Sequence, residues 1–140
     1  MKYKKYTIPL LEQNILFVYC NGDKELDKIK QKKDVKQFFK NVDVDLSEIT
    51  VEDNMGTCYR TVENSKPTLL YIKSTLSEEY LNETLPHEVA HCVYHLSRFA
   101  GFYGENEFNA YLHGAINRDF RKFIKNNSKR YVIRRKKIVF

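Results

Sequence analysis

Residues 82–99 read NETLPHEVAHCVYHLSRF, and apolar side chains recur in this stretch at helical spacing. The apolar positions fall on one stripe, so we expect a helix with one buried face: Leu85, Val89, Cys92, Val93 and Leu96. His87 and His91 are four residues apart. They therefore project from a common side of this helix, about 6 Å apart along its axis.

Two histidines at this spacing can bind one Zn²⁺ through their imidazole nitrogens. Glu88 follows His87 directly, where its carboxylate can accept a proton from a zinc-bound water. The alternative is that both histidines are ordinary, partly buried helix residues. Because the motif falls where a helix is independently expected, we predict a catalytic zinc site with His87 and His91 as ligands and Glu88 as general base.

A catalytic zinc needs a third protein ligand. Glu107, sixteen residues after His91, is the leading candidate, and it opens the helical stretch ENEFNAYLHGAI at 105–116. A simple antiparallel hairpin would not bring Glu107 level with His91, so the two helices must cross steeply or the first must end early. Other candidates for the third ligand are Glu105, His95, His113 and Asp119.

The limits of the motif helix depend on Pro86, which removes a backbone donor just before His87. We expect a helix over about 77–99 with a kink at Pro86, because Ser77 and the two following glutamates are typical of a helix start. The alternative is a helix that begins near Thr84. A loop with Gly101 and Gly104 then leads to a second helix over about 105–125.

Upstream of these helices the chain is rich in strand patterns. Residues 5–11 and 15–20 predict a hairpin, and residues 24–39 predict a charged amphipathic helix. Strands are expected at 46–53, 55–62 and 68–73, with a turn at 64–67 between the last two. Strands early and helices late indicate an α+β fold, and we expect a single domain over 1–140.

The stretch TLLYIKSTLSEEYLNETLPHEVAHCVYHL, followed by GENEFNAYLHGAINRDF, resembles the small HExxH zinc metallopeptidase-like proteins of bacteriophages and mobile elements, related in pattern to ImmA/IrrE and SprT-like metallopeptidases. The resemblance covers about residues 68–120. It implies a minimal zincin-like fold, in which a small antiparallel-rich sheet packs on the HExxH helix and on a following ligand helix. By resemblance His87, His91 and Glu107 are zinc ligands and Glu88 is the catalytic base.

Such families also imply an edge strand beside the zinc that pairs with an extended substrate, and we assign this strand to Thr68–Lys73. Backbone pairing suits a protein or peptide substrate. Peptide hydrolysis also needs a group that stabilises the transition state. Tyr111 is the first candidate for that role, followed by His95, His113 and Tyr94, although such residues are more often packing groups.

The 140 residues are 42% hydrophobic, which suits one compact domain. The three cysteines are spread singly along apolar stretches, as expected for free thiols in a reducing compartment. No apolar run approaches the roughly 20 residues of a membrane helix, and the first residues lack a cleavage site typical of a signal peptide. We therefore expect an intracellular protein without membrane contact, and the resemblance implies the cytoplasm of a bacterial host.

The net charge of +6 is distributed unevenly: residues 118–140 carry +9, and residues 1–117 carry −3. The tail over about 126–140 is the basic part. It predicts either a solvated surface, with a terminal strand at 131–133 or 138–140, or an arm that binds nucleic acid or an acidic protein. Such an arm could hold an anionic partner near the active site. It is also the working surface in our alternative function, a non-catalytic zinc-containing binding protein. Its basic residues are Lys129, Arg130, Arg134, Arg135, Lys136 and Lys137.

Overall fold

A computed structural model describes the backbone of residues 2–102 and 104–139, and the side chains up to residue 127. The fold is α+β, as predicted, with a four-stranded mixed sheet and four α-helices. The strands are β1 (Tyr3–Ile8), β2 (Gln13–Cys20), β3 (Gly56–Arg60) and β4 (Pro67–Lys73). The helices are α1 (Gly22–Lys30), α2 (Lys33–Asn41), α3 (Glu78–Ala100) and α4 (Asn106–Val139), and a short 3₁₀ helix, η1, spans Leu46–Glu48.

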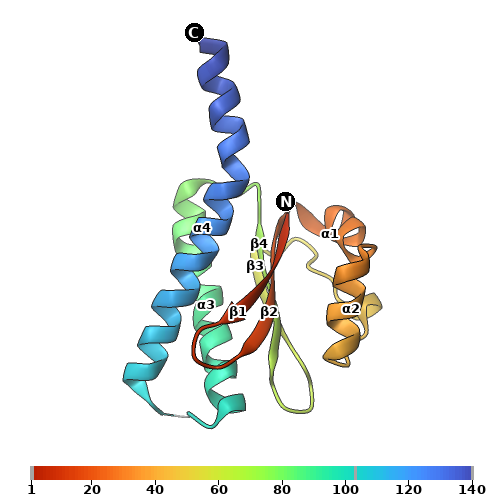
Figure 1. The fold of residues 1–140 in the computed structure, drawn as a ribbon, viewed down its shortest axis with the longest axis vertical. Helices are drawn as coiled ribbons and strands as arrows, with labels where there is room; N and C mark the ends of the chain where they lie inside the picture. The colour runs from red at the N-terminus through yellow and green to blue at the C-terminus, as the bar shows by residue number, and fades with distance from the viewer. Residues whose placement is uncertain (1, 103, 140) are drawn as a thin grey trace.

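The strand order in the sheet is β1-β2-β4-β3. The β1–β2 and β3–β4 pairs are antiparallel, and the central β2–β4 pair is parallel. Helices cover both faces: α1 and α2 lie on one side of the sheet, and α3 and α4 lie on the other (Figure 1). The sheet is therefore the middle layer of three.

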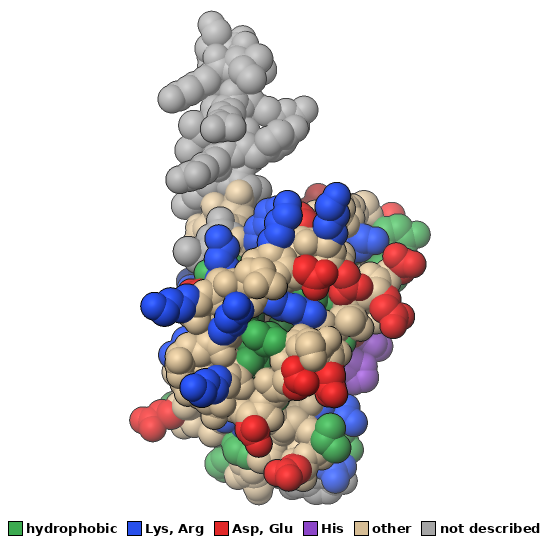
Figure 2. All heavy atoms as spheres, turned by 90° about the vertical axis from the view of Figure 1, so that its right-hand side faces the viewer, with side chains coloured by type: hydrophobic (Ala, Val, Ile, Leu, Met, Phe, Trp, Pro, Cys, Tyr) green, Lys and Arg blue, Asp and Glu red, His purple; other side chains and the backbone are tan. Residues whose placement is uncertain are grey.

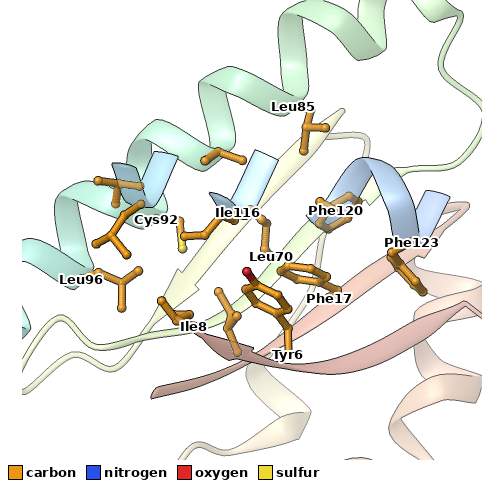
Figure 3. Close-up of a cluster of buried hydrophobic side chains, with 14 of the residues drawn as sticks. Tyr6, Ile8, Phe17, Leu70, Leu85, Cys92, Leu96, Ile116, Phe120 and Phe123 are labelled. Atoms are coloured by element: carbon orange, nitrogen blue, oxygen red, sulfur yellow. The ribbon is translucent and has the colours of Figure 1, made fainter. Parts of the chain in front are cut away.

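Each face of the sheet has its own hydrophobic core. Along β4, Leu70 and Ile72 belong to the core beneath α3 and α4, whereas Leu69 and Tyr71 belong to the core beneath α1 and α2. This division follows from the alternation of side chains along a strand. In the first core, Phe17 stacks on Tyr6 and packs against Phe120 of α4 (Figure 3).

The assignment of Thr68–Lys73 as the edge strand is wrong. These residues lie in β4, which is hydrogen-bonded to β2 on one side and to β3 on the other. Its residues from Pro67 to Ile72 are all buried, as is typical of a central strand covered on both faces. The edge strand on this side of the sheet is β3.

The single helix expected over 24–39 is two helices, with a break at Gln31 and Lys32. Ile29 and Val35 are six residues apart and would face different directions on one straight helix. The break lets both side chains enter the core beneath α1 and α2.

The strand expected at 46–53 is also absent. The Asp45 side chain caps η1, and the backbone N–H groups of Val51 and Glu52 donate to the Asp23 carboxylate rather than to a neighbouring strand. Ile49 and Val51 are buried in this irregular conformation.

The second helix of the predicted pair is longer than expected. The chain is helical to Val139, so the terminal strand considered at 131–133 is not formed, and residues 138 and 139 of the other one are helical. Residue 140 lies outside the described part of the chain. The basic side chains from Lys129 onward lie outside the described residues. None of the described helices combines the length and apolarity that crossing a lipid bilayer requires.

Candidate metal centre

The motif helix α3 begins where its sequence predicts. Ser77 is the N-cap, and its hydroxyl accepts a hydrogen bond from the Tyr80 N–H at 3.3 Å. The helix continues through Pro86 to Ala100 and ends at Gly101, whose φ of +81° is in the left-handed region that favours glycine. The expected start near Ser77 is therefore confirmed, and the alternative start near Thr84 is wrong.

His87 and His91 project together from the outer side of α3. Their Nε2 atoms are 3.2 Å apart, and their ring planes are inclined at 81°. Two nitrogens bound at 2.0–2.1 Å to one tetrahedral ion would be separated by about 3.3 Å. Both side chains are exposed, so their nitrogens are open to an ion from solvent. This donor pair fits zinc.

Glu88 lies beside the two histidines but on the buried side. Its side chain is only 10% exposed, and its Oε1 atom is 3.9 Å from His87 Nε2. One ligand atom from each of the three residues can be chosen so that all lie within 4.8 Å of one another. Burial raises the pKa of Glu88 above its ordinary value, while His91 and His87 oppose that rise. A carboxylate with a raised pKa is suited to accept a proton.

The edge strand β3 lies against the same part of α3. A β-carbon added to Gly56 would lie 2.6 Å from Glu88 Cγ and 2.9 Å from Thr84 Cγ2, which is too close for any residue but glycine without movement. Beside this contact is a hollow of about 330 Å³ lined by Asn54, Met55, Gly56, Glu83, Thr84, His87 and Glu88. The candidate metal centre therefore lies beside a hollow at the start of the edge strand β3.

Two further contacts show that β3 follows α3 toward its C-terminal end. A hydrogen bond to Cys58 of β3, together with burial, raises the pKa of the Cys92 thiol. At the end of the strand, Arg60 Nη1 is 3.4 Å from His95 Nε2. The strand thus runs beside α3 past the histidine pair.

Helix α4 packs antiparallel to α3, on the side of α3 away from β3. The cross-helix hydrogen bonds join Arg121 to Asn82, His113 to the Pro86 carbonyl, and Ser97 to Asn109. Residues near His113 are consequently level with His87, and Glu107 lies beyond the level of Ser97.

The structure brings together only part of the predicted ligand set. Within the described residues, the one group that could hold a metal consists of His87, Glu88 and His91, and Glu107 is not part of it. Glu107 is exposed on the first turn of α4. This placement matches the difficulty expected for a simple antiparallel hairpin.

The other candidate ligands have different surroundings. Asp119 accepts hydrogen bonds from Tyr6 at 2.5 Å and from Arg118 at 3.0 Å. His113 Nε2 is 3.1 Å from the Pro86 carbonyl oxygen, and Glu105 is exposed. None of these side chains belongs to the group around His87 among the described residues.

The candidates for stabilising a transition state are also dispersed. Tyr111 is 52% exposed on α4, and Tyr94 is 49% exposed on α3, one turn past His91. His95 is 9% exposed, and its ring packs at 72° against that of Tyr94. His95 and Tyr94 are thus the candidates on the motif helix, and Tyr111 is on α4.

Sequence reasoning missed the contribution of β3. Gly56 and Arg60 were not singled out, although a glycine inside a strand pattern indicates a close backbone approach.

In Figure 2, which views the α1–α2 side, histidine side chains reach the surface at one edge beside acidic side chains. Glu83 supplies an acidic group within the hollow beside His87.

Protein-family models, curated proteins and solved structures were compared with the chain, and none matches. The resemblance to small HExxH metallopeptidases therefore stays a prediction from the sequence motifs.

Proposed function

We propose that this protein is a zinc-dependent metallopeptidase acting in the cytoplasm of a bacterial host. The observation that carries the proposal is the 3.2 Å separation of His87 Nε2 and His91 Nε2, with the buried carboxylate of Glu88 beside them. A purely structural site has no use for a base at this place. The arrangement supplies two of the ligands and the general base that hydrolysis at a metal-bound water requires.

In this proposal His87 and His91 hold the ion. Bound zinc would polarise the scissile carbonyl and lower the pKa of its water toward about 7. Glu88 accepts the proton of the attacking water and passes it to the leaving amine. Burial of Glu88 against Gly56 fixes the carboxylate in position for both transfers.

We retain Glu107 as the proposed third ligand. Its carboxylate is exposed and lies beyond the level of Ser97. To reach the histidines, the start of α4 would have to shift along α3 and give up the hydrogen bond between Ser97 and Asn109. Zinc titration of Glu107→Ala tests this role, and we expect a weaker affinity than in the parent protein. Unchanged affinity would transfer the role to Glu105 or to a histidine.

The substrate in this proposal is an extended protein or peptide segment paired with β3. As the edge strand, β3 is paired with β4 on one side only, which leaves its other edge for a substrate backbone. Tyr111 remains a proposed stabiliser of the transition state, and its position on α4 makes it dependent on the same movement as Glu107.

The test of the proposed function is peptide cleavage by the zinc-loaded parent protein and by Glu88→Gln. The variant keeps the shape of the side chain but cannot accept a proton, so it should bind zinc and lose cleavage by about 10² to 10⁴-fold. A mass-spectrometric search for new termini in a digested proteome supplies substrates without knowledge of the native one. Equal cleavage by both proteins would exclude Glu88 as the base.

The alternative function, a binding protein that acts through its basic tail, remains a prediction from the sequence. The charge of +9 over residues 118–140 motivates it. Nucleic-acid binding of that kind would be steeply salt-dependent, with log affinity falling by about 0.9 per phosphate neutralised. If the protein does not bind DNA or RNA even at low salt, the role of the tail is either to bind an acidic protein partner or to keep the protein soluble.

A further inference from the structure

A cluster of cationic and aromatic side chains that the proposed chemistry does not use lies at the Arg60 end of β3, opposite the end that carries Gly56. Arg60 Nη1 lies 3.4 Å from His95 Nε2. Arg98 donates to the Tyr94 hydroxyl at 2.7 Å, and its guanidinium lies 5.4 Å from the centre of the Tyr94 ring. The Tyr94 ring in turn packs against His95. Two guanidinium groups thus flank one buried imidazole.

One ring nitrogen of His95 lacks a hydrogen-bond partner among the described residues. A guanidinium can only donate, so Nε2 must be the acceptor toward Arg60, and the ring proton must then be on Nδ1. His95 Nδ1 is buried and has no hydrogen-bond partner within the described part of the chain. An unpartnered polar group in a side chain that is only 9% exposed is a cost to the fold.

The electrostatics around His95 are those of an anion site. Burial, Arg60, His91 and Arg98 all lower the pKa of His95. No carboxylate of the described residues lies within ion-pair distance of Arg60. An anion placed between Arg60 and His95 would accept from the guanidinium and from Nε2–H, and the ring would no longer need its proton on Nδ1.

Acidic residues do occur near this end of β3, in a hollow of about 660 Å³ that both Tyr59 and Arg60 help to line. They are Asp43, Asp45, Glu48 and Glu63. Tyr59 packs against the core beneath α1 and α2, whereas Cys58 packs against the core beneath α3 and α4. The register with β4 shifts between Tyr59 and Arg60, so strand alternation does not place Arg60. Its contact with His95 of α3 puts its guanidinium on the same face as Cys58. The cationic cluster is therefore on the face of β3 that carries the candidate metal centre.

The distance from the metal centre suits a substrate subsite. His95 follows His91 by four residues, which is about 6 Å along the helix. Neighbouring residues of an extended peptide are about 3.3 Å apart. A peptide lying along β3 would thus bring a side chain to His95 about two residues from the scissile bond.

We propose that Arg60 and His95, flanked by Arg98, form a subsite for a carboxylate side chain of the substrate, so that the enzyme prefers peptides with Asp or Glu about two residues from the cleaved bond. This specificity rests on the proposed peptidase function. Arg60 binds the carboxylate from the edge strand, and His95 donates to it from α3. The pairing also fixes the register of the peptide along β3.

Binding to the subsite is tested without cleavage. Isotope-labelled protein is titrated with N-acetyl-glutamate methylamide, and with the neutral N-acetyl-glutamine methylamide, while the His95 imidazole signals are followed by NMR. We expect the glutamate probe to bind about tenfold more tightly than the glutamine probe, as for one charge-assisted hydrogen bond. The preference should vanish in Arg60→Gln and persist in Arg121→Gln, whose arginine contacts Asn82 on the α4 side.

A cleavage experiment provides the second test of the proposed specificity. New termini produced from a digested proteome should show Asp or Glu enriched at one fixed position in the parent protein, and the enrichment should be lost in Arg60→Gln while other peptides are still cut. Cleavage without acidic enrichment, or enrichment that survives in Arg60→Gln, overturns the specificity. Equal perturbation of His95 by both probes overturns the subsite itself. If the parent protein cleaves no peptide beyond those that Glu88→Gln also cleaves, the proposed peptidase function is wrong. The NMR titration alone then decides whether the carboxylate site exists.

Discussion

Gly56 of the edge strand and Glu88 of the motif helix are packed so closely that a β-carbon at position 56 would lie 2.6 Å from Glu88 Cγ. Gly56→Ala should therefore push β3 away from α3 or force the Glu88 side chain out of its position. We expect a loss of about 1–3 kcal/mol in the free energy of unfolding, the range for overpacked sites, together with a fall in any Glu88-dependent activity. Denaturant unfolding and peptide cleavage measure the two effects.

Gly114 provides the matched control. It lies within α4, is exposed, and would bring an added β-carbon within 4 Å of nothing. Gly114→Ala should stabilise the protein by about 0.5–1 kcal/mol because alanine is the better helix former. A comparable loss of stability in both variants would show that the close contact at Gly56 is not the cause.

Helix α3 and the convergence of His87, Glu88 and His91 were predictable because their signals are local. Helix α3 carries an N-cap serine, a helical apolar stripe and a C-terminal glycine within one stretch. The histidine pair and Glu88 need only the pitch of that helix to converge. The contact between Gly56 and Glu88 joins residues 32 positions apart in the sequence, so no local pattern specifies their partnership.

Zinc binding is the most direct consequence of the histidine geometry. Dialysed protein should retain about one zinc per chain, and His87→Ala or His91→Ala should lose it, since each removes one of the two imidazole ligands. Elemental analysis gives the stoichiometry. Both side chains are exposed, so in the presence of a chelator each variant should unfold at the same midpoint as the parent protein. A different midpoint would mean that the variant loses zinc because its fold has changed.

Tyr6 and Asp119 join β1 to α4 by a hydrogen bond of 2.5 Å. Burial raises the pKa of Asp119, but hydrogen bonds from Arg118 and Tyr6 outweigh it, so the pKa is lowered overall. The ionised form of Asp119 thus stabilises the fold above its ordinary pKa of about 4, and this contribution is lost as the pH falls through the lowered value. Tyr6→Phe should cost about 1.5–3 kcal/mol at pH 7, as for a hydrogen bond to a charged group.

The cost of Tyr6→Phe should also depend on pH in one direction. It should shrink as the pH falls below about 4, because protonated Asp119 is the weaker acceptor. Urea unfolding of parent and variant at a series of pH values measures the difference. A cost that is constant down to pH 2 would mean that Tyr6 acts through packing on Phe17 alone.

The three thiols differ in accessibility. Cys20 and Cys92 are fully buried, burial raises the pKa of Cys20 to about 12, and Cys58 is partly exposed on β3. Iodoacetamide at pH 8 should therefore label Cys58 first and the other two only after unfolding. Mass spectrometry of the native protein and of Cys58→Ser checks this order, and rapid labelling of Cys92 would show that β3 separates readily from α3.

The third ligand and the edge strand were less predictable for a different reason. The continuous apolar run of β4 fits a buried strand, but its neighbours are set by sheet topology, which the pattern does not contain. Only its position after the motif makes Glu107 the leading candidate for the third ligand. Whether it reaches the metal depends on the angle and relative shift of α3 and α4, and those are fixed by tertiary contacts such as the bond between Ser97 and Asn109.

Because the sheet is buried on both faces, the layer of α1 and α2 and the layer of α3 and α4 differ in how a substitution in them affects the metal centre. On β2 and β4, neighbouring side chains point into opposite cores, so a change in α1 or α2 meets Leu69 and Tyr71, whereas α3 rests on Leu70 and Ile72. The layer formed by α1 and α2 can therefore accumulate substitutions, or acquire a surface for another protein, with the strands absorbing the adjustment before it reaches His87 and His91. The two layers are free to diverge at different rates over evolutionary time.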